Sequence, residues 1–160
     1  TPIHQGLWGV SGSMAATPAL LKLAEAVHRA GIQFPWEQGA RIARGYADLG
    51  AEEFVIVGPR RIVSLFTGQI TEIETGHEKF FFRVPTLDEL VEEISRREAV
   101  LVNVQFVDAR NWRLELRGRD NQEFSITNAS LEEALLEALG RLVGISSKDA
   151  GAQSRLRVER

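Results

Sequence analysis

The sequence contains no cysteine, and this absence excludes several kinds of chemistry at once. A chain without cysteine has no disulfide framework, no thiol nucleophile and no thiolate ligand for a metal. Its stability must come from a hydrophobic core, which a chain of 160 residues is long enough to bury. Because cysteine-free chains suit a reducing compartment, we expect a cytoplasmic location.

Histidine is also scarce, and no two of its three copies have the i, i+4 spacing of a helical metal-binding pair. No Gly-x-Ser-x-Gly motif marks a nucleophilic serine. The segment 58–61 (GPRR) lacks the glycine spacing and the lysine of a phosphate-binding loop. We therefore expect no cofactor and no bound transition metal.

Long apolar runs and an excess of one charge are missing as well. No stretch approaches the roughly 20 apolar residues of a membrane-spanning helix, so we expect no membrane partner. The chain has 19 basic and 22 acidic side chains, a formal net charge of −3, which gives it no general attraction to nucleic acid. Its 44% hydrophobic and 26% charged residues are typical of an ordinary globular protein.

Both ends of the chain differ from its middle. The single methionine, Met14, follows the small residues of segment 11–13, so we interpret residues 1–13 as a leader or a remnant of cloning. The alternative is a binding peptide built around Leu7 and Trp8. Residues 146–160 lose apolar periodicity and are predicted to form a flexible, slightly basic tail. One compact domain is expected over 14–145.

Four amphipathic helices are predicted from apolar stripes and capping residues. The first begins at Thr17-Pro18 and ends at Gly31. The second is predicted between Pro35 and Gly50 from an apolar stripe with helical spacing, formed by Ile42, Ala43, Tyr46 and Leu49. The third and fourth begin with capping boxes, in which a hydroxyl and a carboxylate three residues later satisfy each other's backbone amides: Thr86 with Glu89, and Ser130 with Glu133.

Short apolar or alternating segments predict strands between these helices. They cover residues 54–57, 62–67, 70–74 and 79–84 in the first half, and 100–106, 112–117 and 124–126 in the second half. We therefore predict an α+β fold with antiparallel β-meanders and amphipathic helices packed on the sheet. Two explanations fit the similarity between 36–85 and 86–144 equally well: duplication of a helix–three-strand unit, or convergence on good capping chemistry.

Aromatic residues on the strands favour a protein-binding role. Phe80, Phe81 and Phe82 place aromatic surface on both sides of one strand, and Trp112 lies on another. Such residues fill a core, or they meet a partner at a sheet edge or face. Our leading hypothesis is a non-enzymatic interaction or assembly module that binds a protein partner or itself, acting as a homo-oligomer.

Two alternatives rest on charged residues. The first is a nucleic-acid-binding accessory protein, in which clustered cations contact phosphates and a ring stacks on a base. Its candidate residues are Arg41, Arg44, Tyr46, Arg60 and Arg61. The second is a magnesium-dependent nuclease built on a hairpin that carries Asp108, Glu115 and Arg117, although Glu115 also fits an ordinary cross-strand ion pair.

Overall fold

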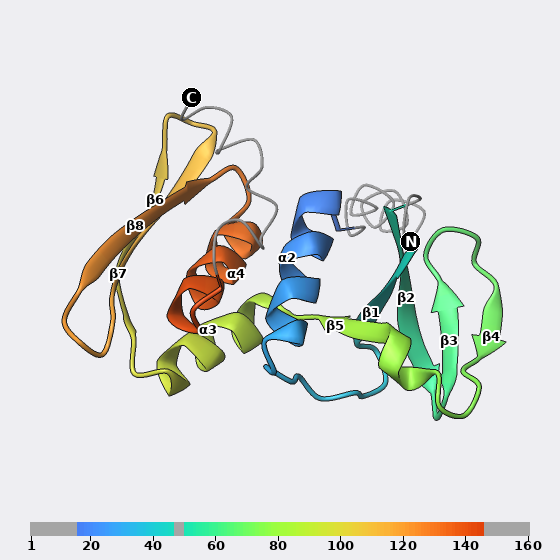
Figure 1. Cartoon of the computed structure of the whole chain (residues 1–160). Helices are drawn as coiled ribbons and strands as arrows, with labels where there is room; N and C mark the ends of the chain where they lie inside the picture. Colours follow the sequence, from blue (N-terminus) through green and yellow to red (C-terminus); the bar gives the residue numbers. More distant parts are fainter. Residues whose placement is uncertain (1–15, 47–49, 146–160) are drawn as a thin grey trace.

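The computed structural model describes residues 16–46 and 50–145, in which three α-helices and two antiparallel sheets make up the fold (Figure 1). This confirms the predicted α+β class. The predicted leader over 1–13 and the predicted tail over 146–160 lie outside the described residues.

Three of the predicted helices are present. Helix α2 (Pro18–Arg29) begins where the Thr17 hydroxyl accepts a hydrogen bond from the Leu20 amide, at 3.1 Å. Helix α3 (Leu87–Arg96) has the complete capping box predicted for Thr86 and Glu89. These caps satisfy amides that have no partner inside the helix, so both boundaries are encoded locally.

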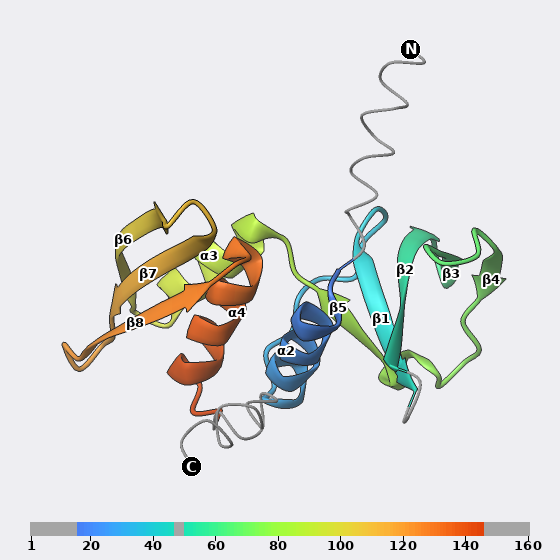
Figure 2. The same cartoon turned by 90° about the horizontal axis from the view of Figure 1, so that it is seen from above.

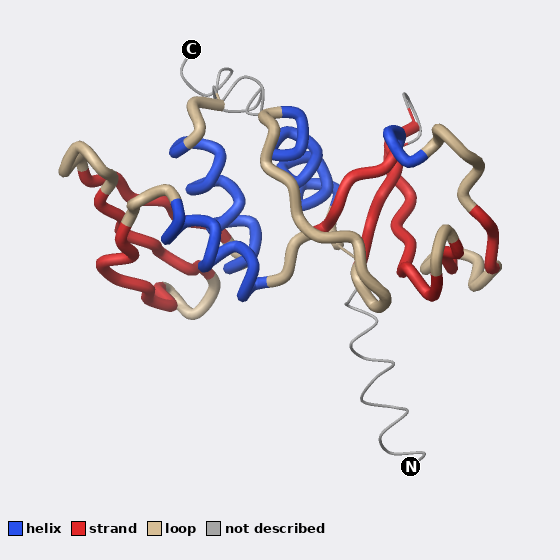
Figure 3. The backbone as a smooth tube through the Cα atoms, turned by 90° about the horizontal axis from the view of Figure 1, so that it is seen from below, coloured by secondary structure: helices blue, strands red, loops and turns tan. Residues whose placement is uncertain are grey.

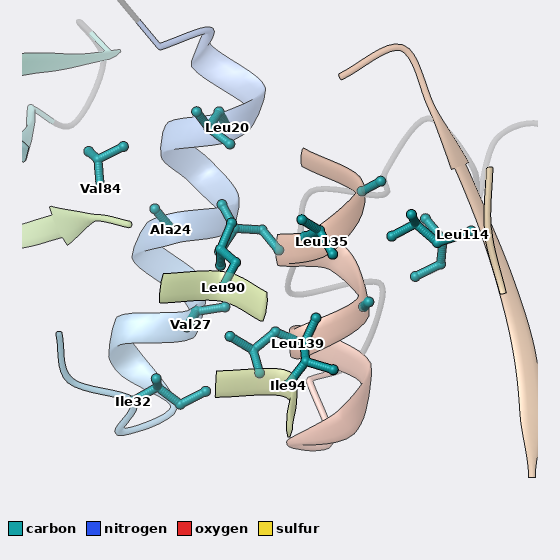
Figure 4. Packing of buried hydrophobic residues seen from close by; sticks show 14 of the residues in the cluster. Leu20, Ala24, Val27, Ile32, Val84, Leu90, Ile94, Leu114, Leu135 and Leu139 are labelled. Atoms are coloured by element: carbon teal, nitrogen blue, oxygen red, sulfur yellow. The ribbon is translucent and has the colours of Figure 1, made fainter. Parts of the chain in front are cut away.

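Helix α4 (Leu131–Leu142) departs from its predicted capping box. The Ser130 hydroxyl accepts from the Glu133 amide at 3.2 Å, as predicted, but the Ser130 amide donates to the Asn128 side chain. The Glu133 carboxylate accepts from the Thr17 hydroxyl at 2.7 Å. Glu133 therefore joins the N-termini of α4 and α2, because the two helices run side by side in the same direction (Figure 4).

The predicted helix between Pro35 and Gly50 is wrong. Residues 41–46 form strand β1, which pairs with β2 on one side and with β5 on the other. Ile42 and Ala43 are both fully buried, but they belong to different hydrophobic clusters on the two faces of the sheet. A strand buried on both faces lacks alternation, so its apolar residues resemble a helical stripe.

The five-stranded sheet has the order β4-β3-β2-β1-β5, with every neighbouring pair antiparallel. Its strands are β1 (Arg41–Tyr46), β2 (Gly50–Gly58), β3 (Arg61–Ser64), β4 (Ile70–Glu72) and β5 (Phe81–Val84), and a short 3-10 turn, η2 (Glu78–Phe80), precedes β5. The predicted strand over 62–67 ends early because the Ser64 hydroxyl accepts from the amides of Phe66 and Thr67, which turns the chain.

The second sheet is the predicted meander of three strands, in the order β6-β7-β8. Its strands are β6 (Val100–Val107), β7 (Asn111–Arg117) and β8 (Glu123–Asn128). Leu114 and Leu116 on β7 are fully buried, as the alternation of that segment predicts. The pairing of β6 with β7 shifts register between Leu101 and Asn103, where β6 contains a bulge.

The helices lie between the two sheets (Figures 2 and 3). Helix α4 packs on β7 and β8, α2 packs on α4 and on β5, and α3 packs on α4. One hydrophobic cluster contains residues of all three helices and of both sheets (Figure 4). A second, smaller cluster lies on the other face of the five-stranded sheet and contains Phe54, Ile62 and Phe81.

The two predicted half-repeats do not share a helix–three-strand order. The unit over 36–85 has no leading helix, because β1 occupies that place. The unit over 86–144 has the predicted order of helix, three strands and helix. What the two units share is the segment in which a strand, a short loop and a capping hydroxyl precede a helix, as at Thr86 and Ser130.

Arg83 on β5 is a buried charge whose role was not predicted. Its side chain, 3% exposed, forms an ion pair with Glu89 at 2.6 Å, and it also donates to the carbonyl groups of Pro35 and Arg41. Glu89 is at the same time the acidic member of the α3 capping box. Arg83 therefore connects three parts of the chain: the segment before β1, β1 itself and the start of α3.

Candidate interaction surface

Strand β6 forms one edge of the three-stranded sheet, and within residues 16–46 and 50–145 its strand neighbour is β7 alone. An edge strand presents backbone N–H and C=O groups that a further strand can bind. The sequence of β6 is VLVNVQFV, eight residues without a charge, proline or glycine. It has two features that favour pairing, its length and its neutrality, and one that opposes pairing, the bulge near its start.

Residues 103–107 form the regular part of β6 beyond the bulge. Val104 lies opposite Leu114, and Phe106 lies opposite Trp112, so both belong to the face of the sheet that the helices cover. Yet Val104 is 43% exposed and Phe106 is 55% exposed. The Phe106 ring contacts the half-buried Trp112, with centroids 5.0 Å apart. We call this region, the open edge over 103–107 with Val104, Phe106 and Trp112, the β6 surface.

The helices leave the β6 surface uncovered because of their position on the sheet. Helix α4 packs on β7 and β8, and α3 packs mainly on α4. Figure 2 shows α4 beside β8, with β6 at the opposite edge of the sheet. Phe106 is therefore exposed, although the alternation of residues 100–106 places it on the apolar face, whereas Leu114 and Leu116 on the neighbouring strand are buried.

The other sheet edges in the described part of the chain are less suited to pairing. Strand β4 has only three residues, and β5 is buried along its whole length. Strand β8 carries Glu123 and is shorter than β6. The β3–β4 loop does expose apolar side chains, with Phe66 at 88%, but the edge strand that follows it, β4, has only three residues.

The predicted partner-binding residues are divided between the cores and the surface. Phe81 and Phe82 are 5% and 3% exposed and lie in the smaller and the larger cluster respectively, so we withdraw both as partner-binding candidates. Phe80 is 45% exposed and lies beside the guanidinium of Arg44, at 5.3 Å. Trp112 is part of the β6 surface. Of the three consecutive phenylalanines, two are therefore buried in different hydrophobic clusters and one is exposed.

The structure does not bring the predicted nucleic-acid-binding residues into one patch. Arg41 lies 2.9 Å from Glu53, on the face of the sheet that meets α2. Arg44 and Tyr46 lie on the opposite face, where the guanidinium of Arg44 stacks on the ring of Tyr46. Arg60 pairs with Glu78, and Arg61 is exposed on β3. A nucleic-acid-binding role stays a prediction, since the candidate residues form no continuous basic surface in the described part of the chain.

The predicted nuclease residues are also separated. Asp108 lies in the β6–β7 turn, before β7 begins at Asn111. Glu115 lies four residues beyond Asn111 on β7, which places it about 13 Å from the start of the strand. Glu115 contacts Arg113 at 3.3 Å. Within residues 16–46 and 50–145, no group of three or more histidine or acidic side chains could hold a metal ion. The geometry therefore gives the nuclease hypothesis no support.

Comparison with known proteins adds no identification. No family model, no curated protein and no solved structure matches the chain. Among the described residues, none of the helices combines the length and the apolar character that crossing a bilayer requires. The function must therefore be inferred from the surface itself.

The sequence did contain a signal for the β6 surface. Segment 100–107 is the longest uncharged strand in the described chain, whereas β7 alternates its apolar residues with Arg113, Glu115 and Arg117. A strand buried on one face usually carries charge on the other. The absence of charge over 100–107 therefore indicated an unusual edge, although it could not show that the helices stop short of it.

Proposed function

We propose that this protein is a non-enzymatic assembly module that self-associates through the β6 surface. Two copies pair their β6 strands antiparallel, which converts two three-stranded sheets into one six-stranded sheet. The observation that carries the proposal is an uncharged edge strand beside exposed apolar side chains, Val104 at 43% and Phe106 at 55%. We place this assembly in the cytoplasm, because a chain without cysteine suits a reducing compartment.

The regular part of β6 is complementary to itself. If the two-fold axis passes through Gln105, then Val104 lies opposite Phe106 of the second copy, and Gln105 lies opposite its own equivalent. A β-branched residue opposite an aromatic one is a favourable cross-strand pair, contributing about 0.2–1 kcal/mol. The two glutamine amides can hydrogen-bond to each other, and no like charges meet along the strand.

A second copy fits this edge better than an unrelated partner for a further reason. In an isologous pair the same patch serves both subunits, so Val104 and Phe106 each occur twice, beside both copies of Trp112. Pairing of one short strand buries less than the roughly 1,200 Å² of a standard stable interface. We therefore expect a weak dimer, with a dissociation constant on the order of 10–100 μM.

A charge-exchange experiment tests the proposal. Gln105→Lys places two like charges directly opposite each other across the axis, and Gln105→Glu does the same with the opposite sign. Gln105 is exposed, so neither change should disturb the fold. In sedimentation velocity on the full chain, we expect the unmodified protein to dimerise, each variant alone to be monomeric, and an equimolar mixture of both variants to dimerise again.

The matched control is Ser125→Lys, an exposed position on β8, the opposite edge of the same sheet, where it faces Glu115. This variant should dimerise as the unmodified protein does. A monomer at all concentrations up to about 1 mM, a range that would still reveal a millimolar dimer, would refute the proposal. So would Gln105→Lys and Gln105→Glu variants that each dimerise with unchanged affinity.

A further inference from the structure

An open pocket of about 480 Å³ lies on the five-stranded sheet, far from the β6 surface in the chain and in the fold. It occupies the face that points away from α2, and residues of β1, β2, β3, the β3–β4 loop, β4 and the segment 73–81 line it. Its volume falls within the roughly 300–1,000 Å³ of small-molecule sites. Four apolar side chains contribute to its lining: Phe54, Ile62, Ile73 and Phe81.

Arg44 provides a cation in this pocket that no carboxylate neutralises at close range. Its guanidinium carbon lies 5.3 Å from the ring centres of Tyr46 and Phe80, and 5.9 Å from that of Phe81. Stacking on these rings holds the planar group in place without using its N–H donors. Among the described residues, Arg44 has no ion pair and no hydrogen-bond acceptor, so its donors are available to a ligand.

Glu52 provides the opposite charge. It lies directly opposite Arg44 in the pairing of β1 with β2, yet the two side chains do not form an ion pair within the described chain. Instead, the Glu52 carboxylate accepts hydrogen bonds from two neutral hydroxyl groups, that of Ser64 at 2.6 Å and that of Tyr46 at 3.3 Å. These hydroxyl groups orient the carboxylate but leave its charge uncompensated.

Ser64 makes this orientation rigid. Its side chain is buried, and its oxygen accepts from the amides of Phe66 and Thr67, at 3.0 and 3.1 Å. With both acceptor positions in use, the hydroxyl proton can only point at Glu52. The pocket therefore has a fixed anion and a fixed cation on adjacent strands, each held by neutral neighbours instead of by the other.

We infer that this pocket binds a small zwitterion with an apolar side chain, the chemistry of a neutral α-amino acid. The carboxylate of such a ligand receives a bidentate pair of hydrogen bonds from Arg44, and its ammonium group donates to Glu52. The apolar side chain lies on the floor of the pocket, where Phe54, Ile62 and Phe81 contribute the small part of their surface that the core leaves exposed. One ligand thereby compensates both charges at once.

The remaining lining residues favour a zwitterion over a simple carboxylic acid. Glu72 and Glu74 also line the pocket and add negative charge to it, and the imidazole of His77 lies 3.7 Å from Glu74. A ligand with a carboxylate alone would meet these charges without compensation, because like charges repel. A ligand with an amine alone would leave Arg44 unpaired. The ligand therefore needs both its carboxylate and its ammonium group.

The test is a titration of the full chain followed by ¹H–¹⁵N NMR. The probes are L-leucine and L-phenylalanine, with 4-methylpentanoate as the analogue without the ammonium group and 3-methylbutylamine as the analogue without the carboxylate. We expect the amino acids to shift amide signals of β1, β2 and β3 with a dissociation constant on the order of 0.1–1 mM. Each analogue that lacks one charge should bind at least about tenfold more weakly.

Two variants examine the two charges separately. Arg44→Met and Glu52→Gln should each weaken amino-acid binding by about tenfold or more. Glu52→Gln keeps an oxygen for the Ser64 hydroxyl, so it preserves the local structure even if Arg44→Met disturbs the stacked rings. Arg61→Met is the control, since Arg61 is exposed on β3 and does not line the pocket.

Three results would overturn the inference. The first is the absence of pocket shifts with either amino acid up to about 10 mM, ten times the weakest expected dissociation constant. The second is an analogue with one charge that binds as tightly as the amino acid. The third is unchanged affinity in both the Arg44→Met and the Glu52→Gln variants. None of these results bears on self-association, which is measured separately through Gln105.

Discussion

Replacing Arg83 by methionine is expected to destabilise the fold by about 3–4 kcal/mol. The side chain of Arg83 is 3% exposed, and methionine fills similar space without a charge or a donor. Its loss removes two hydrogen bonds to the carbonyl groups of Pro35 and Arg41, each contributing about 1 kcal/mol. It also removes the ion pair with Glu89, a charged hydrogen bond worth about 1.5–3 kcal/mol.

These contributions sum to about 3.5–5 kcal/mol, and the expected loss of about 3–4 kcal/mol lies near the lower end of that sum because Glu89 is not left isolated. Its side chain is 21% exposed, so water can solvate it after the substitution, and it still accepts from the Thr86 amide at 2.9 Å. Breaking a fully buried ion pair would cost about 3–5 kcal/mol. For a chain of this length, 3–4 kcal/mol corresponds to a fall in Tm of about 10 °C.

Urea unfolding followed by far-ultraviolet circular dichroism measures this change at neutral pH. The slope of the free energy against urea concentration should stay constant, since a changed slope would indicate a different denatured or native state. Arg29→Met is the matched control, because Arg29 is 75% exposed and its ion-pair partner among the described residues is Glu25 on its own helix. That control should cost less than about 0.5 kcal/mol.

A double-mutant cycle separates the ion pair from the two carbonyl contacts. Glu89→Gln alone and in combination with Arg83→Met should show a coupling energy of about 1–2 kcal/mol. Arg83→Lys should recover only part of the stability, since one ammonium group cannot reproduce the planar fork that reaches three acceptors. If the free energy of unfolding of the Arg83→Met variant lies within about 1 kcal/mol of that of the unmodified protein, the proposed role of Arg83 in connecting three segments is incorrect.

Three further predictions concern the core, the helix junction and the pocket. Leu135→Ala should destabilise the fold by about 2–5 kcal/mol in urea unfolding, because Leu135 is 2% exposed in the cluster shared by both sheets; an effect below about 1 kcal/mol would contradict that packing. Thr17→Ala should cost about 1–2 kcal/mol, since it removes both the α2 cap and the bond to Glu133, whereas Thr86→Ala, at the N-cap of α3 only, should cost about 1 kcal/mol. Burial, and then the neighbouring Glu52 carboxylate, raises the pKa of Tyr46 above that of an ordinary tyrosine. Because Tyr46 is the only tyrosine, the ultraviolet absorbance of tyrosinate reports this pKa directly. A raised pKa in the folded state stabilises the fold below the ordinary tyrosine pKa, and this contribution is lost as the pH rises through the folded value. Glu52→Gln should lower the pKa of Tyr46, and an unchanged titration curve would argue against their contact.

The sequence by itself determined the parts of the fold that depend on local chemistry. Thr17, Thr86 and Ser130 cap helices where predicted, because a hydroxyl at the N-cap satisfies amides within its own turn. The meander over 100–128 was also predictable. Leu114 and Leu116 alternate with charged residues, and this period assigns them to one buried face regardless of what covers it.

Only the tertiary structure decided which elements meet. Residues 41–46 form a strand because β2 and β5 pair with them on both sides, and no local pattern distinguishes such a doubly buried strand from a helix. The alternation of β6 shows an apolar face, but it cannot show that α4 stops at β7 and leaves Phe106 exposed. Long-range packing also brings Arg83 to the carbonyl groups of Pro35 and Arg41, and Arg44 to the rings of Phe80 and Phe81, because these partners are distant in the sequence.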